Sequence, residues 1–228
     1  MRDARPTAMQ VVLWLLLGAA MPLFSAVAHS AESPGYIVID PIPPPDRSRK
    51  VEVVEFFSYG CPHCAAIEPR VRAWEQGIDT SRVEFKRVHA TYSPLMKWLA
   101  RGFYTGEILG VTQHVHAAVF REIHEKGFAL EGRTVEGLAA LYARTGLDTD
   151  EFLQVARTDK VDILLEDADR RQRLYKVDRT PTLIVAGKYR VTAESAGGEG
   201  RMFVVVDELI RREIAIASQQ PGQLNLSY

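Results

Sequence analysis

Cys61 and Cys64 are the residues of this chain with the clearest capacity for chemistry. They are its two cysteines, and they stand three positions apart. A disulfide between them closes a very small loop, and the stabilisation that a disulfide confers grows with the length of the loop. Because such a bridge adds little stability, the spacing favours a redox-active pair over a structural crosslink.

Metal binding is the main alternative for two cysteines at this spacing. Structural zinc takes about four protein ligands, and the chain has no second cysteine pair. Covalent haem attachment needs histidine directly after the second cysteine, where this chain has Ala65. His114 and His116 stand two positions apart, so they do not share a helix face and form a poor metal pair. We therefore expect no metal site, and no cofactor other than the cysteine disulfide itself.

The elements around the cysteines determine how reactive they are. Val51–Phe57 is rich in valine and phenylalanine, which predicts a β-strand, and Pro62 suits the first turn of a following helix. Cys61 then lies at a helix N-terminus, where unpaired backbone N–H groups and the helix dipole stabilise a thiolate. His63 adds to this if it is protonated or donates an N–H. Each unit by which the Cys61 pKa falls below ambient pH stabilises the dithiol by about 1.36 kcal/mol, or about 30 mV, which makes the disulfide an oxidant.

Further elements follow along the chain. They are a strand, a block of short helices, two hairpin strands and a last helix, at Val83–His89, 93–175, Thr182–Ala186, Tyr189–Thr192 and Glu199–Ala217. The first of these strands completes a strand–helix–strand unit with the strand before the cysteines, and its crossover should be right-handed. We expect the hairpin to turn at Gly187-Lys188.

The N-terminal segment has the layout of a secretory signal peptide. Arg2 and Arg5 precede an apolar run, Val11–Phe24, and small residues end at Ala28. The alternative is a transmembrane anchor, but the run is shorter than the about 20 residues that a span needs and is broken by Pro22. We therefore expect residues 1–28 to be removed on export.

Composition and charge exclude some functions. The chain is 46% hydrophobic and 25% charged, as expected of a globular protein with a proper core. Its formal net charge is -1, so no long-range field attracts nucleic acid or an anionic membrane. The cluster of Arg170, Arg171 and Arg173 is expected to be a solvated helix face.

A pattern of motifs extends over nearly all of the chain after the signal segment. It consists of Phe-Phe-x-x-x-Cys-Pro-His-Cys at residues 56–64, the helical block, and Thr180-Pro181 before the strand hairpin. This pattern resembles the DsbA family of periplasmic thiol:disulfide oxidoreductases, and Cys-Pro-His-Cys is its most specific part. The resemblance implies an α/β, thioredoxin-like fold with an inserted all-helical domain. The thioredoxin-like domain would comprise residues 29–92 and 176–228, and the helical insertion residues 93–175.

The resemblance also implies roles for Thr180 and Pro181 in substrate binding. Pro181 matches the superfamily's cis-proline, and a cis bond would turn the Thr180 backbone toward Cys61, ready to pair with a substrate strand. The alternative is a trans proline opening a strand, since cis X–Pro bonds are about 5–6% of those in folded proteins. Thr180 departs from the valine frequent in DsbA proteins and matches the threonine of related isomerases, so the balance between oxidase and isomerase activity stays open.

Glu55 is a carboxylate on an apolar strand face. Strand alternation places it with Val53 and Phe57, and an acid in such surroundings needs a reason. It also stands six residues before the first cysteine, like the buried acid of the superfamily that assists proton transfer at the second cysteine. Its partner is Lys86 or Arg87 on the next strand. The alternative is a solvated glutamate on an edge strand.

The resemblance implies an enzyme that donates the Cys61–Cys64 disulfide, within a catalytic motif completed by Pro62 and His63. Its substrates would be unfolded, newly exported proteins in the periplasm of a Gram-negative bacterium. A DsbB-like membrane quinone reductase would re-oxidise it, and we expect a monomer that binds no nucleic acid.

Three other functions remain open. Two are a periplasmic dithiol reductase and an isomerase of the same fold, although superfamily isomerases carry an N-terminal dimerisation domain for which the segment before Val51 leaves no room. The third is a metal-carrier module using the two cysteines and His63, which the lack of methionine-rich or further cysteine ligands disfavours.

Overall fold

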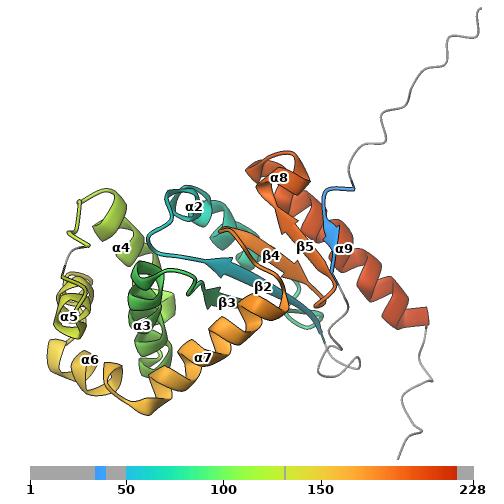
Figure 1. Ribbon diagram of the computed structural model, residues 1–228. Helices are drawn as coiled ribbons and strands as arrows, with labels where there is room; N and C mark the ends of the chain where they lie inside the picture. Colours follow the sequence, from blue (N-terminus) through green and yellow to red (C-terminus); the bar gives the residue numbers. More distant parts are fainter. Residues whose placement is uncertain (1–33, 40–49, 131, 220–228) are drawn as a thin grey trace, which may run out of the picture. The chain divides into compact units, whose positions relative to one another are not determined.

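A computed structural model describes residues 34–39, 50–130 and 132–219 of the chain (Figure 1). The expected signal peptide, residues 1–28, lies outside this part. Among the described helices, none is both long and apolar enough to cross a membrane.

The described strands form one sheet of five, in the order β1-β5-β4-β2-β3. The strands are β1 (Ile37–Val38), β2 (Val51–Phe57), β3 (Val83–His89), β4 (Thr182–Val185) and β5 (Tyr189–Thr192). Strand β2 is parallel to β3 and antiparallel to β4, while β5 is antiparallel to both β4 and β1. The predicted strands before and after the cysteine helix are thus confirmed as a parallel pair.

The pairing register of β2 and β4 brings the cysteines and the Thr180-Pro181 segment to the same end of these two strands. Phe56, near the C-terminal end of β2, pairs with Thr182, the first residue of β4. The loop that leaves β2 toward Cys61 and the loop that enters β4 through Pro181 therefore meet. Since β2 lies between β4 and β3, its apolar sequence is buried on both faces from Val53 to Phe57.

Helices α2 and α9 cover one face of the sheet. Helix α2 (Pro62–Gly77) connects β2 to β3, and the short α8 (Ala193–Ala196) and the long α9 (Glu199–Gln219) follow β5. Buried Val53 of β2 packs in one cluster with Val71 of α2 and Val206 of α9. Glu55 lies two residues along the same strand, so it faces the α2 side of the sheet.

A helical block lies between β3 and β4, as predicted (Figure 1). It comprises α3 (Pro94–Leu109), α4 (Thr112–His124), α5 (Val135–Ala143), α6 (Thr149–Ala156) and α7 (Asp159–Leu174). Ser93, Thr134 and Asp148 cap three of these helices by accepting backbone N–H bonds. The block shares a buried cluster with Val54 and Phe56 of β2, on the sheet face opposite Glu55.

The β4–β5 hairpin turns one residue earlier than predicted. Lys188 N–H donates to the Val185 carbonyl at 3.0 Å, so Ala186 and Gly187 are the central residues of the turn. Both have positive φ, 52° at Ala186 and 64° at Gly187. Glycine tolerates this conformation, whereas alanine adopts it at a cost. The prediction of Gly187-Lys188 as the turn was wrong because nothing in the alanine side chain signals a left-handed residue.

Candidate active site

Cys61 is the N-cap of α2. Its backbone is extended, with φ −92° and ψ 115°, and its sulfur accepts the Cys64 N–H at 3.4 Å. Pro62 follows in the first turn, where its missing N–H costs nothing. The predicted position of Cys61 at a helix N-terminus is therefore confirmed.

The two thiols differ sharply in acidity. Both are free, and Cys61 is 8% exposed against 2% for Cys64. The pKa of Cys61 falls to about 5 because the Cys64 side chain donates a hydrogen bond to its sulfur, while Thr180 and the N–H groups of Cys64 and His63 help and burial opposes. Burial raises the pKa of Cys64 far above its usual value. At neutral pH this pair therefore holds a thiolate at Cys61 and a thiol at Cys64.

The Thr180–Pro181 peptide bond is cis, as the resemblance implied. The Thr180 carbonyl oxygen lies 3.4 Å from the Cys61 sulfur, so the backbone before the proline does face the reactive cysteine. The Thr180 hydroxyl contacts the Tyr92 hydroxyl at 3.4 Å. Tyr92 is 43% exposed and forms an aromatic surface beside the cysteines that the sequence did not indicate.

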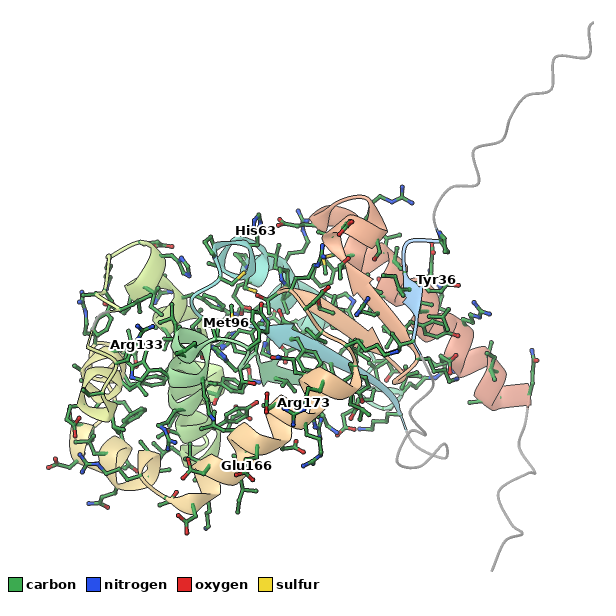
Figure 2. The ribbon with its side chains drawn as sticks, viewed as in Figure 1. Tyr36, His63, Met96, Arg133, Glu166 and Arg173 are labelled. Atoms are coloured by element: carbon green, nitrogen blue, oxygen red, sulfur yellow. The ribbon has the colours of Figure 1, made fainter. Side chains whose placement is uncertain are left out.

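His63 acts on Cys61 through its backbone. The His63 backbone N–H lowers the Cys61 pKa, but the His63 ring points outward at the N-terminal end of α2 (Figure 2). The ring Nδ1 lies 2.9 Å from the Glu199 carboxylate at the start of α9, and the side chain is 75% exposed. The expected stabilisation of the thiolate by the ring has no direct contact to support it in the described residues.

Glu55 is buried, with 2% of its surface exposed, so the interpretation as a solvated edge residue was wrong. Burial raises its pKa to about 8, although the Arg87 charge opposes this. Arg87 Nε lies 3.3 Å from the Glu55 carboxylate, whereas Lys86 pairs with Glu52 and Glu84. Arg87 is thus the partner, and the pair stands at matching positions of β2 and β3.

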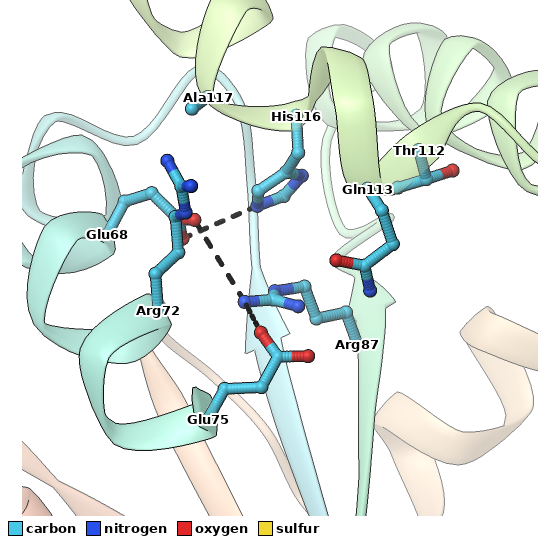
Figure 3. Close-up of a pocket in the computed structure, with 8 residues that line it drawn as sticks. All are labelled: Glu68, Arg72, Glu75, Arg87, Thr112, Gln113, His116 and Ala117. Carbon is cyan, nitrogen blue, oxygen red and sulfur yellow. Dashed lines mark hydrogen bonds and ion pairs between the residues drawn. The ribbon is translucent and has the colours of Figure 1, made fainter. Parts of the chain in front are cut away.

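Side chains of α2, β3 and α4 form a polar cluster around Arg87 (Figure 3), and the sequence did not indicate that Glu68, Glu75 and His116 belong to it. Arg87 Nη2 lies 2.8 Å from Glu75 and 3.9 Å from Glu68. His116 Nε2 lies 3.4 Å from the other oxygen of Glu68. The sequence signal for His116 was its spacing from Val119 and Phe120, which places it on the buried face of α4.

Three histidines hold Tyr59, the residue two before Cys61. The Tyr59 hydroxyl contacts His116 Nδ1 at 2.8 Å, and the Tyr59 N–H donates to His89 Nε2 at 3.0 Å. His124 Nε2 donates to the Tyr59 carbonyl at 2.7 Å. Burial lowers the pKa of His89 to about 3 and also lowers that of His116, so both rings are neutral. This fixed shell positions the loop that carries Cys61.

The Arg170, Arg171 and Arg173 cluster lies on α7 away from the cysteines. Its side chains pair with Asp167 and Asp169 at helical spacing, which confirms the expected solvated face.

Known proteins share both the sequence and this architecture. The family described as Thioredoxin matches residues 46–197. The thiol:disulfide interchange protein DsbA of Azotobacter vinelandii is 36% identical over 178 residues, covering 78% of this chain and 82% of that protein. The DsbA of Pseudomonas aeruginosa PAO1 is 33% identical over 211 residues, covering 90% and 99%. The crystal structure of Pseudomonas aeruginosa DsbA matches with a TM-score of 0.75 and 35% identity, over 81% of this chain and 94% of that one.

These matches cover the cysteine helix, the helical insertion and the strand hairpin together. The fold is thioredoxin-like with a helical insertion, and the chemistry is that of a thiol-disulfide oxidoreductase. The chain therefore belongs to the DsbA family.

Proposed function

We propose that this protein is a disulfide oxidase that donates its Cys61–Cys64 disulfide to newly exported, unfolded proteins in the periplasm. The observation that carries the proposal is the contrast between the two thiols, a pKa of about 5 at Cys61 and a strongly raised pKa at Cys64. A dithiol whose first sulfur is a stable thiolate resists re-oxidation, so its disulfide readily accepts electrons.

The first chemical step is attack by a substrate thiolate on the Cys61 sulfur, the more exposed of the two. The bond between the cysteines breaks, and Cys64 leaves with the electron pair and takes up a proton. A second substrate thiolate then attacks the substrate sulfur of the mixed disulfide. Cys61 leaves as a thiolate, and a thiol of low pKa is a good leaving group.

The rim of the site supplies a surface for an extended substrate. The Thr180 carbonyl lies beside Cys61 and the exposed Tyr92 ring lies next to Thr180. Backbone groups beside a reactive cysteine suit substrates of many sequences, because main-chain hydrogen bonds do not depend on side chains. This supports unfolded proteins as the substrate class.

The rest of the proposed cycle follows the family. Its members come from Gram-negative bacteria such as Azotobacter and Pseudomonas. We place this protein in the periplasm after removal of residues 1–28, acting as a monomer with no cofactor other than its own disulfide. A DsbB-like membrane quinone reductase is the proposed re-oxidant.

The equilibrium of the Cys61–Cys64 couple with glutathione tests the proposal. We expect a potential more positive than about −180 mV, the value typical of disulfide isomerases. A potential near about −270 mV, typical of thioredoxin, would instead identify a reductase. Thr180, the residue shared with isomerases, makes rearrangement of scrambled disulfides the second activity to assay.

A further inference from the structure

The start of α9 lies against α2, close to the cysteines. Both helices cover the same face of the sheet and share one buried cluster. A side-chain carbon added at Gly200 would lie only 3.3 Å from Arg70 Nη1, so a side chain of α2 reaches the first turn of α9. This packing brings Glu199, the first residue of α9, to the His63 ring, with Oε1 at 2.9 Å from Nδ1.

The turn between α8 and α9 sets the position of Glu199. Gly197 ends α8 in a left-handed conformation with φ 78°, and Gly198 follows with φ 134°. Glycine adopts both conformations at no steric cost. The Arg201 N–H then donates to the Gly198 carbonyl at 3.1 Å as α9 begins. The place of Glu199 beside α2 therefore follows from the backbone of the fold.

The contact with Glu199 determines where the His63 ring points (Figure 2). The His63 side chain is 75% exposed, so packing does not restrict it to one rotamer. Among the described residues, Glu199 is the polar partner of the ring. The His63 backbone N–H already acts on the Cys61 sulfur, so a change of rotamer suffices to bring the ring toward that sulfur.

Two anions compete for this ring in the reduced protein, the Cys61 thiolate and the Glu199 carboxylate. A carboxylate only accepts hydrogen bonds, so His63 Nδ1 is the donor in the contact with Glu199. An imidazole that donates an N–H, or that carries a positive charge, stabilises the anion that it contacts. In the structure that anion is Glu199, and the Cys61 sulfur has the Cys64 side chain and backbone N–H groups as its donors.

The competition exists in one redox state only. In the disulfide, the Cys61 sulfur carries no charge, so the ring gains nothing by leaving Glu199. In the dithiol, a ring beside Cys61 would stabilise the thiolate. Because a contact made in one state alone shifts the equilibrium toward that state, a ring kept on Glu199 withholds stabilisation from the dithiol. The disulfide is then a weaker oxidant than it would be with a free ring.

We propose that Glu199 is a positioning residue that holds the His63 ring away from Cys61 and so limits the oxidising power of the Cys61–Cys64 couple. The inference deepens the proposed disulfide oxidase and rests on it. Glu199 acts through the ring, which it contacts directly, and the ring in turn lies two residues from the reactive sulfur.

The equilibrium with glutathione tests the proposal. Two glutathione thiols reduce the Cys61–Cys64 disulfide to the dithiol and leave as one glutathione disulfide. Glu199→Gln removes the carboxylate charge and keeps the size of the side chain. We expect its equilibrium constant for reduction to rise by about two- to fivefold, the range for loss of one exposed ion pair, which makes the potential more positive by about 10–20 mV.

The thiolate absorbance of Cys61 gives a second readout of the same variant. We expect the Cys61 pKa of Glu199→Gln to fall below its value of about 5 in the unmodified protein, because the freed ring stabilises the thiolate. An unchanged or more reducing couple, with an unchanged or raised Cys61 pKa, would overturn the proposal.

Glu208→Gln is the matched control, since Glu208 is exposed on the same helix and the substitution removes the same charge. It should leave both the potential and the Cys61 titration unchanged. Equal shifts in Glu199→Gln and Glu208→Gln would reveal a general charge effect and overturn the role of Glu199.

His63→Ser shows whether Glu199 acts through the ring. In the His63→Ser background, Glu199→Gln should change neither the potential nor the Cys61 titration, since the two residues act as one unit. Shifts of the same size in both backgrounds would contradict the positioning role, because the carboxylate would then act on the thiolate directly.

The role of Glu199 and the proposed oxidase fail separately. The potential of the unmodified protein decides between an oxidase and a reductase, whereas the difference between variants decides the role of Glu199. A thioredoxin-like potential with the expected shift would reject the oxidase and keep the role of Glu199. An oxidising potential with no shift would do the opposite.

Discussion

The Glu55 carboxyl and the Cys64 thiol favour their neutral forms, whereas the Cys61 sulfur favours its charged form, the thiolate. Burial raises the pKa of both, whereas the N-cap position of Cys61 holds a thiolate one turn of helix away. We therefore predict that Glu55 donates a proton to the leaving Cys64 sulfur, and that this donor is protonated before substrate binds. Such pre-organisation of proton transfer is what lets positioned acids accelerate reactions.

The raised pKa of Glu55 makes the fold depend on pH. The unfolded carboxyl has a pKa of about 4.5 and the folded one a pKa of about 8, so between these values the folded state binds more protons than the unfolded state. Stability therefore falls as pH rises through this window, by up to about 1.4 kcal/mol per pH unit. Urea unfolding at pH 5 and pH 8 should show this loss in the oxidised unmodified protein, in which Cys61 does not titrate, and a much smaller loss in oxidised Glu55→Gln.

Glu52→Gln on the same strand is the control for that measurement. It removes a partly exposed ion pair with Lys86, which is worth less than about 1 kcal/mol, and should leave the pH dependence intact. Equal pH dependence in Glu55→Gln and the unmodified protein would show that Glu55 ionises freely.

The partner of Glu55 illustrates what sequence alone leaves open at the residue scale. Alternation along the strand identified Glu55 as an unusual acid, but Lys86 and Arg87 are neighbours on the next strand. Only the register decides between them, because Glu55 stands opposite Arg87 and the side chains of opposed residues project to the same face. Register depends on how two strands meet, and local sequence does not encode that.

At the scale of elements, the positions of strands and helices were readable from periodicity and caps. Thr134 and the strand Val51–Phe57 were predicted and confirmed because their signals are local. The buried contacts of Glu68 and His116 could not be predicted in the same way. They depend on α2 and α4 approaching each other across 48 positions of sequence that separate the two residues.

The turn between β4 and β5 contains a residue in a strained backbone conformation, and a substitution can test that strain. Ala186 has φ 52°, a left-handed conformation that costs a non-glycine residue roughly 1–2 kcal/mol. Ala186→Gly removes this cost but adds unfolded-chain entropy, so we expect a net gain of about 0.5–1 kcal/mol in the free energy of unfolding. Denaturant titration measures it.

Ala140→Gly is the opposite control, because Ala140 is exposed within α5 in ordinary helical conformation. The Ala140→Gly variant should lose about 1 kcal/mol in the free energy of unfolding. A loss of stability in both variants would mean that the turn relaxes around Ala186 without strain.

At the scale of the whole molecule, the redox state should control stability. A disulfide normally stabilises a protein, but folding also lowers the Cys61 pKa from 9.0 to about 5. This lowered pKa stabilises the folded dithiol fully above the unfolded value and is lost as pH falls through about 5. We therefore expect the reduced protein to unfold at a higher temperature than the oxidised protein at pH 7.

That difference in unfolding temperature should shrink as the pH is lowered to 4.5. Its gradient is at most about 1.4 kcal/mol per pH unit and is reduced by screening, because the Cys61 sulfur is not fully buried. Calorimetry of both forms at the two pH values measures it. An oxidised protein that is the more stable form at pH 7 would contradict the assignment of Cys61 as the stabilised thiolate.

The His63–Glu199 contact joins residues 136 positions apart, and the Cys61–Thr180 contact joins residues 119 apart. During synthesis the two cysteines emerge long before Thr180, Pro181 and the start of α9 exist. The Thr180 contact and the completed sheet are therefore missing in the nascent chain, so we expect its Cys61 pKa to lie closer to the ordinary value of a thiol. We expect the full reactivity of Cys61 to begin only near the end of synthesis, which protects the growing chain from unwanted disulfide exchange with other chains.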